Sequence, residues 1–527
     1  MLRPDARRTR IAHLPSGPAG TSRIGLQAVA VVGLVALLLG GCAPAKPAAT
    51  AVPVAAPSAT ASIDPKLKEF YEQKISWKKC DTFQCATAKV PIDYANPAAG
   101  SIELALKRAR ATKGDAIGSL VINPGGPGVS GVNLVDSAVT TFGKGVVAKY
   151  DIVGFDPRGV GKSHPVKCQS NAAKDELIGL DFDYSTDAGI AAAKAMYTTM
   201  GKACAANTGP LLAHVDTVSA AKDMDVLRAA LGDKKLSYLG YSYGTALGAT
   251  YAGLFPDRVG RMVLDGALDP TTSSKDLALI QAKGFQNALR AYVVDCEGGP
   301  KCPLTGDVNS GLAQIHDLVE RARRSPLPTG TNRPLTGSLA SYGIIFPLYD
   351  NQYWPLLSKA LTKAIGQNDG SILLKLSDIY NDRNQDGTYS ANTSEAFTAI
   401  NCLDGTSTAD PAEMRADTAE IVKVAPTLGA FFGFGGVACA GWPYPATGKP
   451  GPITAKGAAP ILVIGTTNDP ATPYAWAQGL AKQLSSGVLL TYQGEGHTAY
   501  GRSNGCIAGT VDAYLLAGTV PKDGKRC

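Results

Sequence analysis

One serine stands between two glycines in the segment GYSYG, at positions 240–244. A serine that acts as a nucleophile on a sharp strand-to-helix turn needs glycine at both places, because a side chain there would crowd the turn. The surroundings fit, since LSYL before the segment favours a strand and TALGATYAGLF after it favours a helix. Ala246 and Gly248 allow that helix to pack closely on neighbouring strands. We therefore expect Ser242 to be a nucleophile; the alternative is an ordinary helix start rich in small residues.

A serine hydroxyl is a weak nucleophile until a base removes its proton, so a histidine should lie close to Ser242. Among five histidines, His497 alone follows a strand-like run in a glycine-flanked loop, QGEGHTAYG. The remaining histidines lie in the N-terminal segment, beside loops or on a helix face, and are expected to have no catalytic role: His13, His164, His214 and His316.

The base needs a carboxylate that orients it, and Asp469 follows a strand-like run in the loop GTTNDPATP. Serine, acid and histidine in this chain order form one of the known triad arrangements. The alternative role for Asp469 is to form a turn before proline. Asp265, in VLDGALDP, is the second candidate for the acid.

Acyl transfer also needs hydrogen-bond donors for the negative oxygen of the tetrahedral intermediate. One donor should be the backbone N–H of Tyr243, directly after the nucleophile. We expect the other donor to be Gly126, in the loop NPGGPG after an earlier strand-like run, because a missing side chain lets a carbonyl oxygen approach. A plain Gly/Pro turn is the alternative for this loop.

From about residue 100 the chain alternates apolar strand-like runs with helical patterns, which predicts an α/β fold with a mostly parallel sheet flanked by helices. The helix expected over 216–231 presents one apolar face, made of Val218, Ala221, Met224, Leu227 and Leu231. Between 272 and 445 the strand rhythm disappears, and amphipathic helices alternate with Pro/Gly loops. We interpret this region as a largely helical cap, since strand-and-loop units return after it; the alternative is a separate C-terminal domain.

The N-terminus has the pattern of a targeting segment, because an arginine-rich stretch precedes the apolar run IGLQAVAVVGLVALLL. The sequence Leu-Gly-Gly-Cys ending at Cys42 resembles a bacterial lipobox, which implies cleavage before Cys42 and lipidation of its sulfur. An unlipidated secretory signal or an uncleaved anchor are the alternatives, and all three place the domain outside the cytoplasm. Residues 1–41 hold five arginines and one acid, so only about +3 of the net charge of +7 remains, weak grounds for a nucleic-acid partner.

Apart from Cys42, the chain has ten cysteines, an even number that suits disulfides in an oxidising compartment. Paired C-x-x-C spacings are missing, so a zinc site is not expected, and neither is any other metal or cofactor. The segment ending in GKS at 161–163 is not a phosphate-binding loop, because Asp156 stands where that loop requires glycine. Sequential pairing is the simplest expectation for the cysteines: Cys80 with Cys85, Cys168 with Cys204, Cys296 with Cys302, Cys402 with Cys439, and Cys506 with Cys527.

The segments NPGGPG, DPRGVGKS and GYSYG, in this order, resemble the proline iminopeptidase superfamily of α/β-hydrolases. The segments around NDPATP and GEGHT, the paired cysteines and the leader are similar to the actinobacterial tripeptidyl-aminopeptidase-like branch and to mycobacterial envelope proteases of this type. The likeness covers roughly residues 70–527. One difference is that the loop begins with Asn-Pro where the iminopeptidases usually have His-Gly.

The resemblance implies an exported serine peptidase with Ser242, Asp469 and His497 as its triad, acting on peptides and releasing short ones, such as tripeptides, from N-termini. An aminopeptidase also needs a carboxylate for the substrate ammonium, and Asp404 in NCLDG is our candidate, with a solvated loop acid as the alternative. Other possible functions are an envelope esterase or lipase, an inactive lipid-anchored binding protein, and a solute-binding lipoprotein. The expected domains are a signal peptide (1–41), a flexible tether (42–65), the first part of the hydrolase core (66–271), the helical cap (272–445) and the C-terminal part of the core (446–527).

Overall fold

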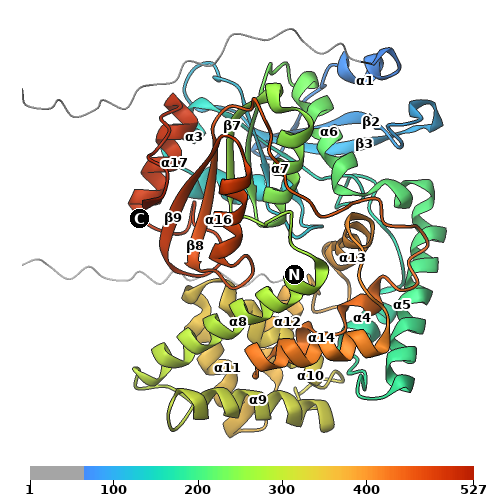
Figure 1. The fold of residues 1–527 in the computed structure, drawn as a ribbon, viewed down its shortest axis with the longest axis vertical. Coiled ribbons are helices and arrows are strands. Elements are labelled where there is room, and N and C mark those ends of the chain that lie inside the picture. The colour runs from blue at the N-terminus through green and yellow to red at the C-terminus, as the bar shows by residue number, and fades with distance from the viewer. Residues whose placement is uncertain (1–63) are drawn as a thin grey trace, which may run out of the picture. The chain divides into compact units, whose positions relative to one another are not determined.

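A ten-stranded sheet forms the centre of the protein in the computed structural model, which describes residues 64–527 (Figure 1). The strand order is β1-β2-β3-β5-β4-β6-β7-β8-β9-β10. The predicted signal peptide, Cys42 and most of the predicted tether lie outside the described residues. The strands are β1 (Lys78–Cys80), β2 (Phe83–Pro91), β3 (Ser101–Ala109), β4 (Ser119–Asn123), β5 (Asp151–Phe155), β6 (Leu236–Tyr241), β7 (Val259–Asp265), β8 (Ile461–Asn468), β9 (Gly487–Glu495) and β10 (Lys525–Arg526).

The sheet is parallel from β5 to β10, which confirms the predicted fold class. The sequence analysis missed the antiparallel part, in which β1, β2 and β3 pair with one another and β3 pairs with β5. The missed signal is the alternation in SIELALKRA, where Ile102, Leu104 and Leu106 are buried and their neighbours are more exposed.

Helices cover both faces of the sheet, and alternate strand residues face opposite layers. Leu120 and Ile122 of β4 pack in one core with α2 (Gly131–Thr141), α3 (Lys144–Lys149) and α17 (Gly505–Ala517). Val121 lies in the other core, with α6 (Thr217–Ala230), α7 (Tyr243–Leu254) and α16 (Tyr474–Gln483). In α6 the prediction for Val218 was wrong: this side chain is 39% exposed, because the helix lies on the sheet through Ala221, Met224 and Leu227 further along.

A second, helical layer has its own apolar core and follows β7 in the chain (Figure 1). Two earlier helices also contact it: α4 (Asn171–Gly179) packs against α10 (Gly337–Ile345), and α5 (Asp187–Thr208) reaches η7 (Gly435–Ala438), while Met200 and Cys204 of α5 are buried in the core of the sheet. Asp181, directly after α4, accepts hydrogen bonds from the first two N–H groups of α10. The layer also contains α8 (Ser274–Glu297), α9 (Val308–Arg324), α10, α11 (Trp354–Gly366), α12 (Ser371–Tyr380), α14 (Pro411–Val424) and α15 (Gly429–Phe432). Helix α13 (Thr393–Asp404) instead packs on the sheet, because Ala396, Ala399, Ile400 and Leu403 are buried in the same core as Val121.

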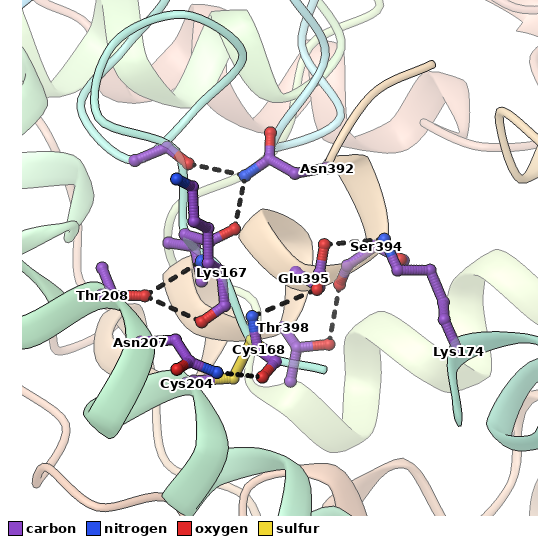
Figure 2. The surroundings of a disulfide bond; sticks show 12 residues. Lys167, Cys168, Lys174, Cys204, Asn207, Thr208, Asn392, Ser394, Glu395 and Thr398 are labelled. Atoms are coloured by element: carbon purple, nitrogen blue, oxygen red, sulfur yellow. Dashed lines mark hydrogen bonds and ion pairs between the residues drawn. A yellow bond between two sulfur atoms is a disulfide. The ribbon is translucent and has the colours of Figure 1, made fainter. Parts of the chain in front are cut away.

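Helix α13 is fastened to the chain around the Cys168–Cys204 disulfide (Figure 2). Its Glu395 accepts a hydrogen bond from the Cys168 N–H and pairs with the buried Lys174 ammonium at 2.7 Å. The Asn392 amide, just before the helix, donates to the carbonyls of Gly159 and Val166. A cavity of about 660 Å³ lies beside this anchor, and Ser242, Asp469 and His497 are not among its lining residues.

All five predicted disulfides are present, and each joins neighbouring cysteines along the chain. Within residues 64–527, no helix combines the length and hydrophobicity that a membrane crossing requires.

Candidate active site

Ser242 sits on the turn between β6 and α7, with φ 55° and ψ −123°. This left-handed conformation is strained for a residue with a side chain. The two flanking glycines leave room for it, as predicted: a Cβ on Gly240 would lie 2.6 Å from the Tyr238 ring, and one on Gly244 would lie 2.9 Å from the Asn123 carbonyl oxygen. The strand–turn–helix expected around Ser242 is therefore confirmed.

His497 and Asp469 come together from the loops that follow β9 and β8. The His497 Nδ1 lies 2.9 and 3.0 Å from the two Asp469 carboxylate oxygens. Asp469 is 3% exposed, and four further donors surround it: the N–H groups of Ala471, Thr472 and Thr498, and the Thr472 hydroxyl. These hydrogen bonds fix the carboxylate in the orientation in which it meets the imidazole.

Asp265, the second candidate for the acid, has a different task. Its buried carboxylate accepts hydrogen bonds from the N–H groups of Ala499 and Tyr500, directly after the histidine loop. Burial raises its pKa to about 6. Asp265 therefore holds the loop that carries His497, whereas Asp469 contacts the ring.

The end of β7 contacts Ser242, and the residue that follows it lies beside His497. The Ser242 N–H donates to the Asp265 carbonyl at 2.9 Å, and a Cβ on the next residue, Gly266, would lie 3.3 Å from Cε1 of His497. The hydrogen bonds of residues 64–527 join His497 to Asp469, but none joins the Ser242 hydroxyl to His497. In unliganded enzymes this catalytic hydrogen bond is often long and tightens only when substrate binds.

The glycine loop after β4 lies directly on the Ser242 turn. A Cβ on Gly125 would be 3.0 Å from both the Tyr243 nitrogen and the Ser242 Cβ. The Gly125 N–H is used by the Asn123 side chain at 2.9 Å. In contrast, within the described part of the chain the N–H groups of Gly126 and Tyr243 donate to no protein acceptor. Two free N–H groups next to a serine are what an oxyanion site needs.

The segment DPRGVGKS supports this region without reaching Ser242. Asp156 accepts hydrogen bonds from the Ser130 hydroxyl and from the Val132 N–H at the start of α2, just beyond the glycine loop. Arg158 is fully buried and binds Asp223 through two nitrogens, at 2.5 and 2.7 Å. Asp156 thus fixes the start of α2, and Arg158 ties the same segment to α6.

The sequence analysis missed two residues that contact His497. The Thr472 hydroxyl lies 3.2 Å from Nδ1 and 3.1 Å from Asp469, so it touches both members of the pair. Tyr349, from the helical layer, accepts the His497 N–H on its carbonyl at 2.7 Å, and its ring meets the imidazole edge-on at 5.4 Å. The spacing Asp-Pro-Ala-Thr could have indicated Thr472, as a hydroxyl that bonds back to a turn aspartate. Tyr349 is distant in sequence and carries no comparable signal.

Asp404 lies at the C-terminal end of α13 and not in a solvated loop. Its two oxygens accept hydrogen bonds from the N–H and hydroxyl of Thr217. The described histidines other than His497 make no contact with the pair; His316, for example, lies 3.3 Å from the Thr427 carbonyl. In residues 64–527, no three His, Cys, Asp or Glu side chains are grouped as metal ligands.

Comparison with known proteins places this site in a family. Serine protease Hip1 of Mycobacterium tuberculosis is 40% identical over 479 residues, which cover 86% of this chain and 91% of Hip1. The profile described as "TAP-like protein" matches residues 425–527, which carry both Asp469 and His497. The chain belongs to the TAP-like family of α/β-hydrolases.

Other TAP-like relatives have different activities in their names. Carboxylesterase B of M. tuberculosis is 38% identical over 469 residues, covering 86% of this chain and 89% of that protein. A tripeptidyl aminopeptidase of Streptomyces coelicolor is 31% identical over 468 residues, covering 84% of each chain. This TAP-like chain is accordingly a serine hydrolase.

Proposed function

We propose that this protein is a serine peptidase in which Ser242, His497 and Asp469 form the catalytic triad. The observation that carries the proposal is the Asp469–His497 pair, held by six hydrogen-bonding contacts beside a strained serine turn. Strained backbone and converging loops of this kind are typical of a nucleophile site. The names of Hip1 and of the Streptomyces relative support peptides over other substrates.

In this mechanism His497 removes the Ser242 proton as the hydroxyl attacks the scissile carbonyl. The carbonyl oxygen becomes negative and accepts hydrogen bonds from the N–H groups of Gly126 and Tyr243. His497 then protonates the leaving amine, while Asp469 stabilises the imidazolium. Water, activated by the same imidazole, hydrolyses the acyl-enzyme and regenerates Ser242.

The finer specificity is release of tripeptides from free N-termini, as the Streptomyces relative's name indicates for that protein. Digestion of a peptide library by the wild type and by Ser242→Ala, followed by mass spectrometry, tests this. N-terminally trimmed products in steps of three residues, absent from the variant, would support the proposal. Internal cuts would instead indicate an endopeptidase, and equal activity of the variant would refute the role of Ser242.

Ester hydrolysis is the second candidate, favoured by the similarity to carboxylesterase B. The same triad performs both reactions, so the acyl and leaving groups that fit decide between them. Turnover of tripeptide anilides and of short acyl esters should be compared at equal enzyme concentration. Strong ester hydrolysis without amide cleavage would reverse the order of the two candidates. If Ser242 also failed to react with a fluorophosphonate, an inactive binding protein would be the better description.

The proposal extends to location and domain arrangement. The protein is exported and anchored by lipid on Cys42, with residues 42–65 as a tether, so that it acts on peptides at a membrane surface. Residues 66–271 and 446–527 form the catalytic core, and 272–445 form the cap together with α4 and α5. Cys42→Ser should move the protein from the membrane fraction to the soluble fraction; unchanged membrane association would contradict lipidation at this residue.

A further inference from the structure

A short chain of hydrogen bonds runs from the end of α13 to the residue after Ser242. The Tyr243 hydroxyl makes a short hydrogen bond with the Thr217 hydroxyl. Thr217 binds Asp404 twice: its hydroxyl donates to Oδ2 at 2.5 Å and its N–H donates to Oδ1 at 2.7 Å. Three elements therefore meet here, because Tyr243 begins α7, Thr217 begins α6 and Asp404 ends α13.

These hydrogen bonds fix the hydroxyl of Tyr243, while the backbone N–H of the same residue belongs to the oxyanion site. The Tyr243 side chain is 7% exposed, and its N–H is the free donor beside Gly125. The backbone of Tyr243 follows a strained residue at the start of a helix, where no preceding helical turn fixes it. Anchoring its hydroxyl therefore limits how the first turn of α7 can rotate.

Each oxygen of Asp404 already accepts one hydrogen bond from Thr217, so a substrate ammonium would have to share the carboxylate with this residue. The titratable groups that face the carboxylate are Asp216, beside Thr217 on α6, and the Tyr243 phenol on α7. Burial, opposed in part by the Thr217 hydrogen bonds, raises the Asp404 pKa to about 7, and the charge of Asp216 adds to the increase. The ionisation of Asp404 therefore changes in the range where a serine peptidase works.

We propose that Asp404 is a positioning residue, which orients the Thr217 hydroxyl and through it the Tyr243 side chain and the oxyanion N–H. The inference rests on the proposed function and replaces our expectation that Asp404 binds the substrate amine. When ionised, Asp404 accepts from Thr217, and the Thr217 oxygen accepts from Tyr243. When protonated, Asp404 donates to Thr217, so the Thr217 hydroxyl turns its own proton toward the Tyr243 oxygen and the direction of the chain reverses.

The test uses full-length Asp404→Asn, with Asp410→Asn as the matched control. Asp410 also caps a helix, α14, but it is exposed and binds only the N–H groups of Ala412 and Glu413. For Asp404→Asn we expect kcat to fall about 10–100-fold with KM nearly unchanged, since a misplaced oxyanion donor affects the transition state. Affinity for a peptide aldehyde, whose adduct places an oxygen in the same site, should fall in parallel. The control variant should keep wild-type values.

A pH series separates this role from a merely structural one. Asparagine resembles the protonated acid, so the difference between wild type and Asp404→Asn should be largest near pH 8 and shrink as the pH falls below 7. Taking the ratio of the two proteins at each pH removes the pH effects that both share. A ratio that does not change with pH would overturn the proposal, as would wild-type kcat and aldehyde affinity.

Three further variants test the proposal if Asp404→Asn does not fold. Tyr243→Phe and Thr217→Val should each lower kcat in the same way, and Thr217→Ser, which keeps the hydroxyl, should retain most of it. Wild-type kcat in both of the first two variants would overturn the proposal. A KM increase for free-amine peptides alone, with N-acetylated ones unaffected, would indicate ammonium binding by Asp404 instead. Loss of the proposed function itself would appear separately, as unchanged activity of Ser242→Ala.

Discussion

Replacing Asp469 by asparagine tests the triad most directly, because the structure fixes how the new amide must point. The Oδ1 position receives the N–H groups of both Ala471 and Thr472, at 3.0 and 2.8 Å, so the amide oxygen must occupy it. The amide nitrogen then takes the Oδ2 position, 3.0 Å from Nδ1 of His497. There it donates to Nδ1, which forces the imidazole proton onto Nε2, the nitrogen that must accept the serine proton.

The expected loss of kcat is about 10³–10⁴-fold, which corresponds to about 4–5.5 kcal/mol in the barrier. The fold should survive. The Thr498 N–H, now 3.1 Å from an amide nitrogen, loses its acceptor, and the Thr472 hydroxyl can turn to accept instead. One unsatisfied N–H costs about 1–3 kcal/mol of stability.

The assay measures kcat on a tripeptide anilide, together with the rate of fluorophosphonate labelling and the thermal midpoint. Asp265→Asn is the matched control, since Asp265 is equally buried and adjacent but contacts only the loop backbone. Its kcat should fall much less than that of Asp469→Asn. A folded Asp469→Asn protein that keeps kcat within tenfold of the wild type would refute the assignment of the acid.

Three further results are expected. Ser242→Gly should unfold about 1 kcal/mol less readily than Ser242→Ala in urea, because relief of about 1–3 kcal/mol of backbone strain exceeds the entropic cost of glycine; equal stability would mean that the strain at φ 55° is no larger than this entropic cost. Arg158→Met should lower stability by about 3–5 kcal/mol by leaving Asp223 charged and buried, whereas Lys107→Met, whose partner Asp136 is half exposed, should cost less than about 1 kcal/mol; similar losses would contradict the burial argument. The pKa of Asp265 is raised to about 6 in the folded protein, so folding takes up a proton between the unfolded and folded pKa values. The stability of the wild type relative to Asp265→Asn should therefore fall by up to about 3 kcal/mol as the pH rises from 4 to 6. A rise in relative stability over this range would show that the pKa is lowered instead.

Much of the catalytic geometry could be predicted because it depends on local rules and few candidates. The turn at Ser242 has no room for side chains at the flanking positions, and the structure shows that a Cβ on Gly240 or Gly244 would clash. His497 and Asp469 were identified by strand-end position and chain order, and their side chains lie 2.9 Å apart in the structure. The parallel strands were visible as apolar runs because both of their faces are covered by helices.

The rest depends on packing between distant segments, which leaves little trace in one sequence. Nothing local connects Tyr349 with His497, because the contact arises from the way the helical layer sits on the loop after β9. The same holds for Asp404, whose partner Thr217 is 187 residues away. Helices α4 and α5 follow a core strand, and only their contacts with the later helices reveal that they reach the helical layer. The first strands were missed because β2 and β3 are partly exposed, so their buried residues alternate with exposed ones and form no continuous apolar run.

Helix α13 is tied to the core at both ends. Asn392 and Glu395 hold its start (Figure 2), and Asp404 holds its C-terminal end. Swinging it away would break a buried ion pair and leave several polar groups unsatisfied, so wide opening by rotation about this helix is costly.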